Sequence, residues 1–405
     1  MTTEIRVLDS EDDLLAAANV FRTAMVGFPP LSNLQPGQIT KMLEPGRTVG
    51  AFVAGQLVGT ADATTSRLTL PGGAIVGHAA VTHIGVLPSF TRKGIATDLV
   101  RHQLHDIAAR GEVVATLRAS EATIYGRYGY GVASSSQTVE VQTARAALRP
   151  DVGTGGPVRL LDAAQAWDVL PRIYTGSRPS RPGTVDRPAV WWQGLRLRSE
   201  ALPGASYIAV HGEPGEESGF ARYRPIDTET WFVSDQRTIV VEDFFAPTMD
   251  AYLGLMRFLL GVDLVDRVTF WMLPVDDPLP WLLLDRRAAR VTAVHDETWL
   301  RVVDAREALT ARQYDGEGAV TIAVNDPLLQ SNSASFSIAA DGAEKTDRRP
   351  QLHVGIEGLG AVLLGGATWR RLAMAGLARA DDPAALAVAD QLFAVPVAPY
   401  AGFFF

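Results

Sequence analysis

One stretch in the first third of the chain constrains the fold most, because it reads as a strand, a loop, a helix and a second strand in succession. The apolar run Val81–Leu87 predicts a strand, and Pro88 ends it because proline donates no hydrogen bond to a strand ladder. After a loop, apolar residues recur at helical spacing, so we expect a helix that begins at about Gly94. A strand at Glu112–Leu117 follows. This order predicts a mixed α/β sheet with its ligand site at the strand ends.

The loop before the predicted helix has the features of an anion site. Unpaired amide groups and the helix dipole create partial positive charge at a helix N-terminus, and Arg92 and Lys93 add to it. Gly94 lacks a Cβ atom, so a phosphate can approach the backbone closely. The loop is not a P-loop, and the chain has no Gly-x-Gly-x-x-Gly fingerprint at this joint. The pattern therefore favours a pyrophosphate held by a different kind of loop.

Two motifs extend the pattern. Arg92-Lys-Gly-Ile-Ala96 opens the helix, and Tyr125-Gly-Arg-Tyr-Gly-Tyr130 follows the second strand. With the strand before the loop, they resemble the GCN5-related N-acetyltransferases. In that family the loop amides hold the pyrophosphate of coenzyme A, the preceding strand pairs with the pantetheine arm, and a tyrosine lies near the thiol. The chain departs from the family at Thr91, where Gln or Arg is usual.

Composition excludes several classes of function. The 405 residues suffice for two or three domains, and the net charge of −8 without a basic stripe argues against nucleic acid as a partner. The chain has no cysteine, and its seven histidines show no ligand spacing, so we expect no metal. A polar, acidic N-terminus predicts no signal peptide, and no apolar run is long enough to span a membrane. The sequence therefore predicts a cytoplasmic protein.

Along the chain we expect three regions: a catalytic domain over 1–148, a second domain over 157–288 and a third over 289–405. The second repeats the element order of the first, but its strand–helix joint, Phe244-Phe-Ala-Pro-Thr248, has no glycine and no basic residue. A copy of the fold that has lost its phosphate loop explains this. In the first region, the apolar segment Met25–Leu34 either lines a substrate entrance or packs on the core.

Three features together resemble a narrower family, the Eis-type (enhanced intracellular survival) acetyltransferases of actinobacteria. They are Ser120-Glu-Ala-Thr-Ile-Tyr-Gly-Arg-Tyr-Gly-Tyr-Gly131, the pair Asp277-Pro-Leu-Pro280 and Trp299-Leu-Arg-Val302, and the aromatic C-terminal tail. The resemblance covers the whole chain. It implies an α/β (α+β) fold class, with tandem GCN5-related acetyltransferase folds plus a sterol-carrier-protein-like C-terminal domain. It also implies acetyl-CoA as co-substrate, a hexamer of two trimers, and acetylation of aminoglycoside amines or, in some members, of lysines.

Carried over residue by residue, the resemblance implies that Tyr125 is the general acid and that the α-carboxylate of Phe405 is the general base. A tail that ends in three phenylalanines should be buried, which would bring this carboxylate inside. A backbone N–H of the central strand, plausibly that of Val86, would polarise the acetyl carbonyl. The cofactor contacts implied are the pantetheine-pairing strand, the pyrophosphate loop and the segment before Tyr125: Ile84, Gly85 and Val86; Arg92, Lys93, Gly94, Ile95, Ala96 and Thr97; Ser120 and Glu121.

The sequence leaves the identity of the acceptor amine undetermined. Family members that act on aminoglycosides carry an acid near the position of Phe21–Gly27 and another just before the terminal phenylalanine, where this chain has Phe404. Without these acids, a small-molecule amine that is more hydrophobic becomes plausible. Acetylation of protein or peptide lysines is the alternative enzyme reading. The alternative from another class is a non-catalytic acetyl-CoA sensor or a carrier of apolar ligands.

Overall fold

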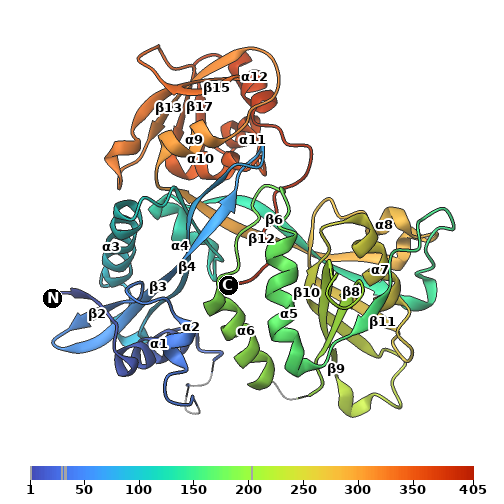
Figure 1. Ribbon diagram of the computed structural model, residues 1–405. Coiled ribbons are helices and arrows are strands. Elements are labelled where there is room, and N and C mark those ends of the chain that lie inside the picture. Colours follow the sequence, from blue (N-terminus) through green and yellow to red (C-terminus); the bar gives the residue numbers. More distant parts are fainter. Residues whose placement is uncertain (1, 29–30, 32–33, 202–203) are drawn as a thin grey trace.

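The computed structural model describes residues 2–28, 31, 34–201 and 204–405. In this part of the chain, both predicted acetyltransferase-like units share one twelve-stranded sheet with the order β1-β2-β3-β4-β5-β12-β6-β11-β10-β9-β8-β7 (Figure 1). Its strands are β1 Glu4–Val7, β2 Val49–Val53, β3 Gln56–Thr69, β4 Ile75–Val86, β5 Val114–Leu117, β6 Gly131–Gln142, β7 Val158–Leu160, β8 Tyr207–His211, β9 Gly219–Ile226, β10 Thr238–Phe245, β11 Arg267–Pro274 and β12 Ala289–Val302. The sheet holds the two units in a fixed relation.

The two units exchange strands at the centre of this sheet. Strand β6 comes from the first unit and pairs with β11 of the second, whereas β12 follows the second unit and pairs with β5 of the first. The sequence prediction missed β6, because its serines hide the alternation of apolar residues. Residues 299–302 fall in the predicted third region, but they form the end of β12, and their main-chain pairing joins them to the large sheet. The division at residue 289 stays a prediction.

Helices α1 (Glu11–Met25) and α3 (Ile95–Ala109) cover opposite faces of the first unit. A Cβ atom on Gly85 would touch Phe21 and Ala24 of α1, whereas one on Gly59 would touch α3. Gly85 pairs with Thr60, which is the neighbour of Gly59 on β3. Because consecutive residues of a strand face opposite sides of a sheet, Gly59 and Gly85 face opposite sides, and the helices that contact them do so too. Ser10 caps the start of α1, because its hydroxyl accepts from the N–H of Asp13 at 3.2 Å.

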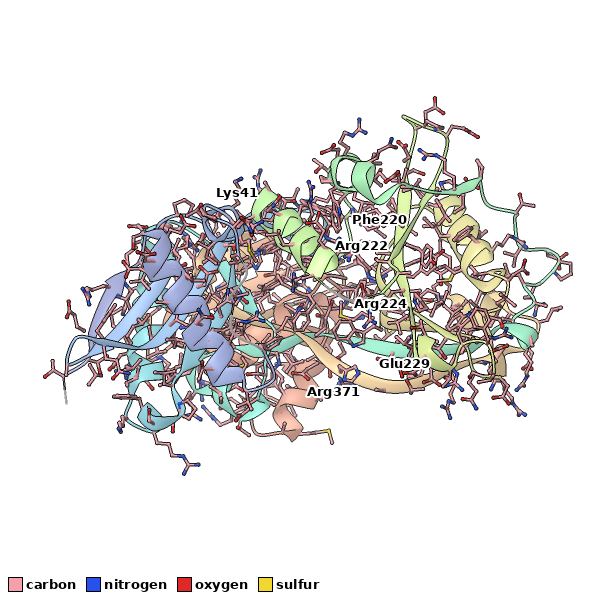
Figure 2. The ribbon with its side chains drawn as sticks, turned by 90° about the horizontal axis from the view of Figure 1, so that it is seen from below. Lys41, Phe220, Arg222, Arg224, Glu229 and Arg371 are labelled. Atoms are coloured by element: carbon pink, nitrogen blue, oxygen red, sulfur yellow. The ribbon has the colours of Figure 1, made fainter. Side chains whose placement is uncertain are left out.

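The second unit repeats the layout of the first. Helices α5 (Ala163–Gly176) and α6 (Ala189–Ala201) pack on one face, and α7 (Met249–Leu260) connects β10 to the parallel strand β11. Figure 2 shows Phe220, Arg222 and Arg224 following one another along β9. They are two residues apart and so share a face. The guanidinium of Arg222 lies 5.2 Å from the centroid of the Trp167 ring, which places that face beneath α5.

The third unit has its own sheet, with the order β15-β14-β13-β16-β17. Its strands are β13 Ala319–Asn325, β14 Ala334–Ala339, β15 Gly342–Lys345, β16 Leu352–Gly355 and β17 Ala378–Ala380. Its longer helices are α9 Ala305–Ala311, α10 Ile356–Leu363, α11 Trp369–Met374 and α12 Ala384–Leu392; the remaining short helices of the chain are α2 Ile39–Met42, α4 Ala122–Tyr125 and α8 Leu279–Leu282.

Two contacts hold the third unit against the large sheet. Arg301 of β12 is fully buried and donates to both carboxylate oxygens of Asp326 at 2.8 Å. Helix α10, which the sequence prediction missed, packs so closely that a Cβ atom on Gly360 would lie 2.3 Å from the carbonyl oxygen of Leu300. Only glycine permits this approach. From this unit the C-terminal tail runs to a point between the two acetyltransferase-like units (Figure 1).

Candidate active site

Strands β4 and β5 separate and leave part of the β4 backbone free. Their parallel pairing joins only residues 78–80 to residues 114–116, whereas β4 continues to Val86. The N–H of Leu87 donates to the carbonyl oxygen of Val58 on β3 at 2.8 Å. Because N–H groups alternate in direction along a strand, the N–H of Val86 points away from β3, toward the open side. Residues Ile84, Gly85 and Val86 therefore lie where an extended, amide-containing ligand could pair with them.

A β-bulge interrupts β4 just before these residues. The register with β3 shifts between Thr60 and Asp62, and His83 has a positive φ of 51°. A bulge increases the local twist and redirects a side chain. Here it turns the imidazole toward α1, where its ring meets Phe21 edge-on at 4.8 Å between ring centroids.

The N-terminus of α3 is open to solvent. Gly94 is the N-cap residue, has a φ of 86° that favours glycine, and makes no capping hydrogen bond through a side chain. A Cβ atom at this position would meet nothing within 4 Å. Thr91, Arg92, Lys93 and Gly94 are exposed, and the ammonium of Lys93 donates to the carbonyl oxygen of Ser89 at 3.0 Å. The first-turn amides are thus available, and residues Arg92–Thr97 could hold a pyrophosphate.

The matching joint in the second unit is closed. Thr248 caps α7 there, and its hydroxyl accepts from the N–H of Ala251 at 3.2 Å. Pro247 precedes it and has no N–H to offer. The two joints therefore differ in whether N–H groups at the start of the helix are free to bind an anion. That the second copy lacks a phosphate loop stays a prediction.

Tyr125 ends the short helix α4, close to the end of β5. It is 7% exposed, and its ring lies 6.1 Å from that of Tyr130. Burial raises the pKa of the Tyr125 hydroxyl above its ordinary value, and a hydrogen bond from Ser120 opposes this only in part. The phenol therefore holds its proton at neutral pH. Ser120 and Glu121, the other residues predicted in this segment, are exposed.

The turn after Tyr125 contacts the third unit, strand β12 and helix α3. Gly129 has a φ of 85°, and a Cβ atom there would lie 2.5 Å from a methyl carbon of Ile356. The guanidinium of Arg301 donates to the carbonyl oxygen of Tyr128 at 2.8 Å. On the other side, the Tyr128 hydroxyl lies 3.1 Å from that of Thr97 on α3. The tyrosine turn is thereby fixed to both the helix and the third unit.

The C-terminal tail is anchored by buried charges of the large sheet. The carboxylate of Glu297, on β12, accepts from the N–H groups of Ala401 at 3.2 Å and Gly402 at 2.9 Å. Arg118, which follows β5, pairs with Glu297 at 3.3 Å and also donates to the carbonyl oxygen of Phe403. Buried charges are stable only when they are paired and hydrogen-bonded. These residues therefore determine the path of the tail.

The three terminal phenylalanines have different surroundings. Phe403 is buried, Phe404 is 48% exposed and stacks on Trp271 with 6.0 Å between ring centroids, and Phe405 is half-buried. The prediction that all three are buried is therefore wrong for Phe404. The reason is that an extended tail presents successive side chains to opposite sides.

The ring of Phe405 stacks flat on Trp191, with 4.9 Å between ring centroids and an interplanar angle of 3°. It also lies 6.4 Å from the ring of His78 on β4 and 5.4 Å from the Arg118 guanidinium. These contacts place the end of the chain over strands β4 and β5. Among the residues that the structure describes, no ion pair engages its carboxylate.

The second unit also holds the tail. Arg187 and Asp243 form a buried pair, with nitrogen–oxygen distances of 2.7 and 3.1 Å. Arg187 also donates to the carbonyl oxygen of Gly402 at 3.2 Å, and its guanidinium lies 4.4 Å from the ring centroid of Phe403. Burial lowers the pKa of Arg187, but the Asp243 carboxylate and the Tyr174 phenol together more than offset this, and the net shift of the pKa is upward. The guanidinium is thus charged in the folded protein.

A cavity of about 730 Å³ lies beside this part of the tail. It is lined by the separated ends of β10 and β11 and by residues 394–397 and 400–402. The Tyr400 hydroxyl donates to the carbonyl oxygen of Met272 on β11 at 3.0 Å. This position in the second unit corresponds to the open edge between β4 and β5 in the first. The second unit therefore uses its separated strands to hold the tail.

The structure brings together the predicted residues of β4, of the loop and of α3, and Tyr125, which follows β5, belongs to the same buried cluster as Val81 of β4 and Leu104 of α3. Sequence reasoning missed Glu297, Arg187 and Trp191, and it did not connect Arg118 with the tail. No local motif marks these residues, because each contacts the tail across more than a hundred residues of sequence.

The apolar segment Met25–Leu34 lies partly outside the described residues, at positions 29, 30, 32 and 33. Within the described part, Phe28 stacks on Phe21 with 6.2 Å between ring centroids.

Comparisons with known domains agree with this architecture. Residues 4–133 and 183–302 each match an acetyltransferase (GNAT) domain, and residues 305–402 match a sterol carrier protein domain. The predicted fold class, two GCN5-related units followed by a sterol-carrier-like unit, is confirmed. Fold and site define an acetyltransferase of the GCN5-related class, and domains of this class use acetyl-CoA.

Relatives along the full chain narrow the class. An uncharacterized N-acetyltransferase from Streptomyces avermitilis is 34% identical over 397 residues, which cover 95% of either chain. The N-acetyltransferase Eis of Mycobacterium tuberculosis is 32% identical over 364 residues, which cover 86% of either chain. The crystal structure of Eis1 from Mycobacterium abscessus matches with a TM-score of 0.92 and 47% identity, over 99% of this chain and all of that one. The chain belongs to the Eis family of N-acetyltransferases and is an enzyme.

Two features are absent from the described residues. No helix among them is both long enough and apolar enough to cross a bilayer. Nor do three or more of their His, Asp or Glu side chains gather in a group that could hold a metal ion.

Proposed function

We propose that the enzyme acetylates a primary amine of a small molecule, with Tyr125 as general acid and the Phe405 α-carboxylate as general base. The observation that carries this proposal is the anchored tail. Arg118, Glu297 and Arg187 hold the residues just before Phe405, and the Phe405 ring lies beside His78 on β4. Because buried charged side chains hold the tail at three places, the fold itself determines the position of the C-terminus.

Acetyl-CoA supplies the activated acyl group and the thiolate that leaves. Ile84, Gly85 and Val86 would pair with its pantetheine arm, and Arg92, Lys93, Gly94, Ile95, Ala96 and Thr97 would hold its pyrophosphate. The N–H of Val86, directed to the open side of β4, is suited to polarise the thioester carbonyl. Ser120 and Glu121 would add contacts next to Tyr125.

The protonation state of each proposed group suits its role. Burial keeps the proton on Tyr125, so its hydroxyl can donate to the leaving sulfur. A carboxylate without an ion-pair partner in the described structure, like that of Phe405, can accept a proton from an attacking amine. Because no side chain supplies this base, any residue added after Phe405 removes it.

Aromatic side chains around the tail support an amine with apolar or aromatic character. Phe404 and Trp271 stack with half of their surface exposed, and Phe404 stands where an acid would hold a polycation. Aminoglycosides therefore form the less favoured part of the substrate proposal. Protein or peptide lysine is the second candidate, and the exposure of this aromatic pair is compatible with a peptide chain.

The test is release of coenzyme A from acetyl-CoA across aromatic amines, aliphatic amines, aminoglycosides and lysine peptides, with protein that has a free C-terminus. Turnover should be highest with an aromatic or apolar amine and should be lost when two glycines are added after Phe405. The matched control carries an N-terminal extension of equal length. Undiminished turnover with the extended C-terminus would exclude the carboxylate as base. Turnover with lysine peptides alone would replace the small-molecule substrate.

Other features rest on the family resemblance and are proposed together with the function. They are a homo-hexamer, a cytoplasmic location and the absence of a nucleic-acid partner. Sedimentation velocity would test the first, since a hexamer of this chain has about six times the monomer mass. A smaller species at micromolar concentration would contradict it.

A further inference from the structure

The bulge in β4 brings together two titratable groups that the mechanism above does not use. Nδ1 of His83 lies 3.4 Å from Oδ2 of Asp62 on β3. The side chain of Asp62 is 2% exposed and that of His83 is 42% exposed. The other oxygen of Asp62 accepts from the Thr48 hydroxyl at 2.9 Å. One carboxylate oxygen is thus committed to the interior, and the other faces an accessible imidazole.

In the part of the chain that the structure describes, the ion-pair partner of the Asp62 carboxylate is the His83 imidazole. A buried carboxylate is stable only when hydrogen bonds or a cation compensate its charge.

A carboxylate at Nδ1 also determines which ring nitrogen is free. It accepts the Nδ1–H bond, so the lone pair of the neutral ring lies on Nε2. The ring meets Phe21 of α1 edge-on. From α1, the nearest charged residue in sequence is Arg22, whose guanidinium lies over Phe28, 5.5 Å from the ring centroid. Asp62 is the charged group that faces the imidazole from β3.

We propose that His83, oriented by Asp62, accepts the first proton from the bound ammonium of the acceptor. This inference rests on the proposed amine acetylation and adds a second base to it. An ammonium nitrogen must lose two protons to become an amide nitrogen, while the sulfur gains one and one is released. His83 takes the proton that frees the nitrogen lone pair, and the Phe405 carboxylate takes the second. His83 is three residues from Val86, whose N–H faces the acyl site.

The variants follow from the backbone. His83→Asn removes the base and suits the positive φ, because asparagine tolerates the left-handed region. Asp62→Asn keeps the shape and removes the charge that orients the ring, so Asp62 is tested as a positioning residue. His105→Gln, on the exposed side of α3, is the matched control.

The readout is kcat/KM from pH 6 to pH 10 with the best acceptor of the amine panel. His83→Asn should lower kcat/KM at pH 7 by about 100-fold, the lower range for general bases. This loss should shrink as pH approaches the pKa of the amine, since free amine then needs no base. Asp62→Asn should give a smaller loss of the same pH dependence, and His105→Gln none. A loss that is equal at every pH, or no loss, would overturn the proposal.

A second measurement needs no acceptor. Nitrogen-15 NMR of histidine-labelled enzyme reports which ring nitrogen carries hydrogen, and His83→Asn identifies the signal of His83. We expect the Nδ1–H tautomer in the wild type and a mixture in Asp62→Asn. An Nε2–H tautomer in the wild type would overturn the inference. If no amine is acetylated, the proposed function fails, while the tautomer still shows whether Asp62 orients the His83 ring.

Discussion

The buried pair of Arg187 and Asp243 allows stability and tail position to be separated. Arg187→Met removes the positive charge and leaves the Asp243 carboxylate buried without its partner. Breaking such a pair costs about 3–5 kcal/mol of unfolding free energy. With an unfolding entropy of about 2.1 cal/mol/K per residue, 405 residues convert this to a fall in Tm of about 4–6 °C. The same change removes the hydrogen bond to the Gly402 carbonyl oxygen.

The double variant Arg187→Met/Asp243→Leu is the matched control. Apolar residues of similar volume replace both charges, and such replacements of buried ion pairs are often neutral or stabilising. We therefore expect Tm to return to within about 2 °C of the wild type. This difference corresponds to a remaining loss of about 1–2 kcal/mol of unfolding free energy from imperfect repacking. The Gly402 bond stays absent. A charge-assisted bond contributes about 1.5 kcal/mol or more, so kcat should stay about tenfold below the wild type.

The assays are thermal unfolding and release of coenzyme A with the best amine of the panel. Loss of stability in the single variant, and recovery of Tm without recovery of kcat in the double variant, would support tail positioning by Arg187. If the double variant regains both, the pair serves stability alone and the reasoning about the tail is refuted. Unchanged Tm in the single variant would refute the burial argument.

Three further predictions address the acid, a buried histidine and the cofactor loop. Tyr125→Phe should lower kcat by about 100-fold or more with little change in acetyl-CoA affinity. Because the pKa of the Tyr125 hydroxyl is raised, any loss of wild-type rate from its ionisation should occur above about pH 10. A fall in acetyl-CoA affinity that equals the fall in kcat would contradict the role of Tyr125 as general acid. Burial, and then the nearby arginines, lower the pKa of His78 from 6.5 to about 3, so the neutral ring favours the folded state and stability falls as pH drops from 6.5 toward 3. Urea unfolding at pH 6.5 and 5 should show a loss of about 2 kcal/mol that is absent in His78→Gln; equal losses in both proteins would exclude His78 as the cause. Arg92→Gln should raise the Kd of acetyl-CoA by about 10- to 100-fold, whereas Arg101→Gln, exposed farther along α3, should leave it unchanged in a calorimetric titration; equal effects would point to net charge instead of a loop contact.

Local patterns predicted those elements whose sequence signals agree with their surroundings. The strand before Pro88 and the helix after Gly94 lie where the sequence predicts them, and the Ser10 side chain caps the start of α1. Proline, glycine and serine act there through their own backbone or side-chain chemistry, within a few residues. The open helix N-terminus at Gly94 and the closed one at Thr248 follow from the same kind of local information.

Elements whose burial comes from distant partners could not be found in this way. The strand β6 carries serines at positions 134 and 136 that are buried because the tail anchor and neighbouring strands surround them. Helix α10 contains two glycines that are unfavourable in an isolated helix. Gly360 is required because the helix backbone packs there against that of Leu300, and a Cβ atom on Gly358 would lie 2.5 Å from a methyl carbon of Val354. The pairing of residues 299–302 with the large sheet could not be predicted for a similar reason, since the partner strand β5 lies almost two hundred residues earlier.

By itself, the sequence determined the class of the protein, the loop that suits a pyrophosphate and the tyrosine that follows β5. These depend on residues that are close in sequence, where spacing and backbone chemistry decide the geometry. The tertiary structure alone decided the exchange of β6 and β12, the path of the tail past Glu297 and Arg187, and the pairing of His83 with Asp62. Each of these brings together residues separated by about twenty to more than two hundred positions. Their contacts arise only when the sheet forms, because burial then requires every charge and every main-chain group to find a partner.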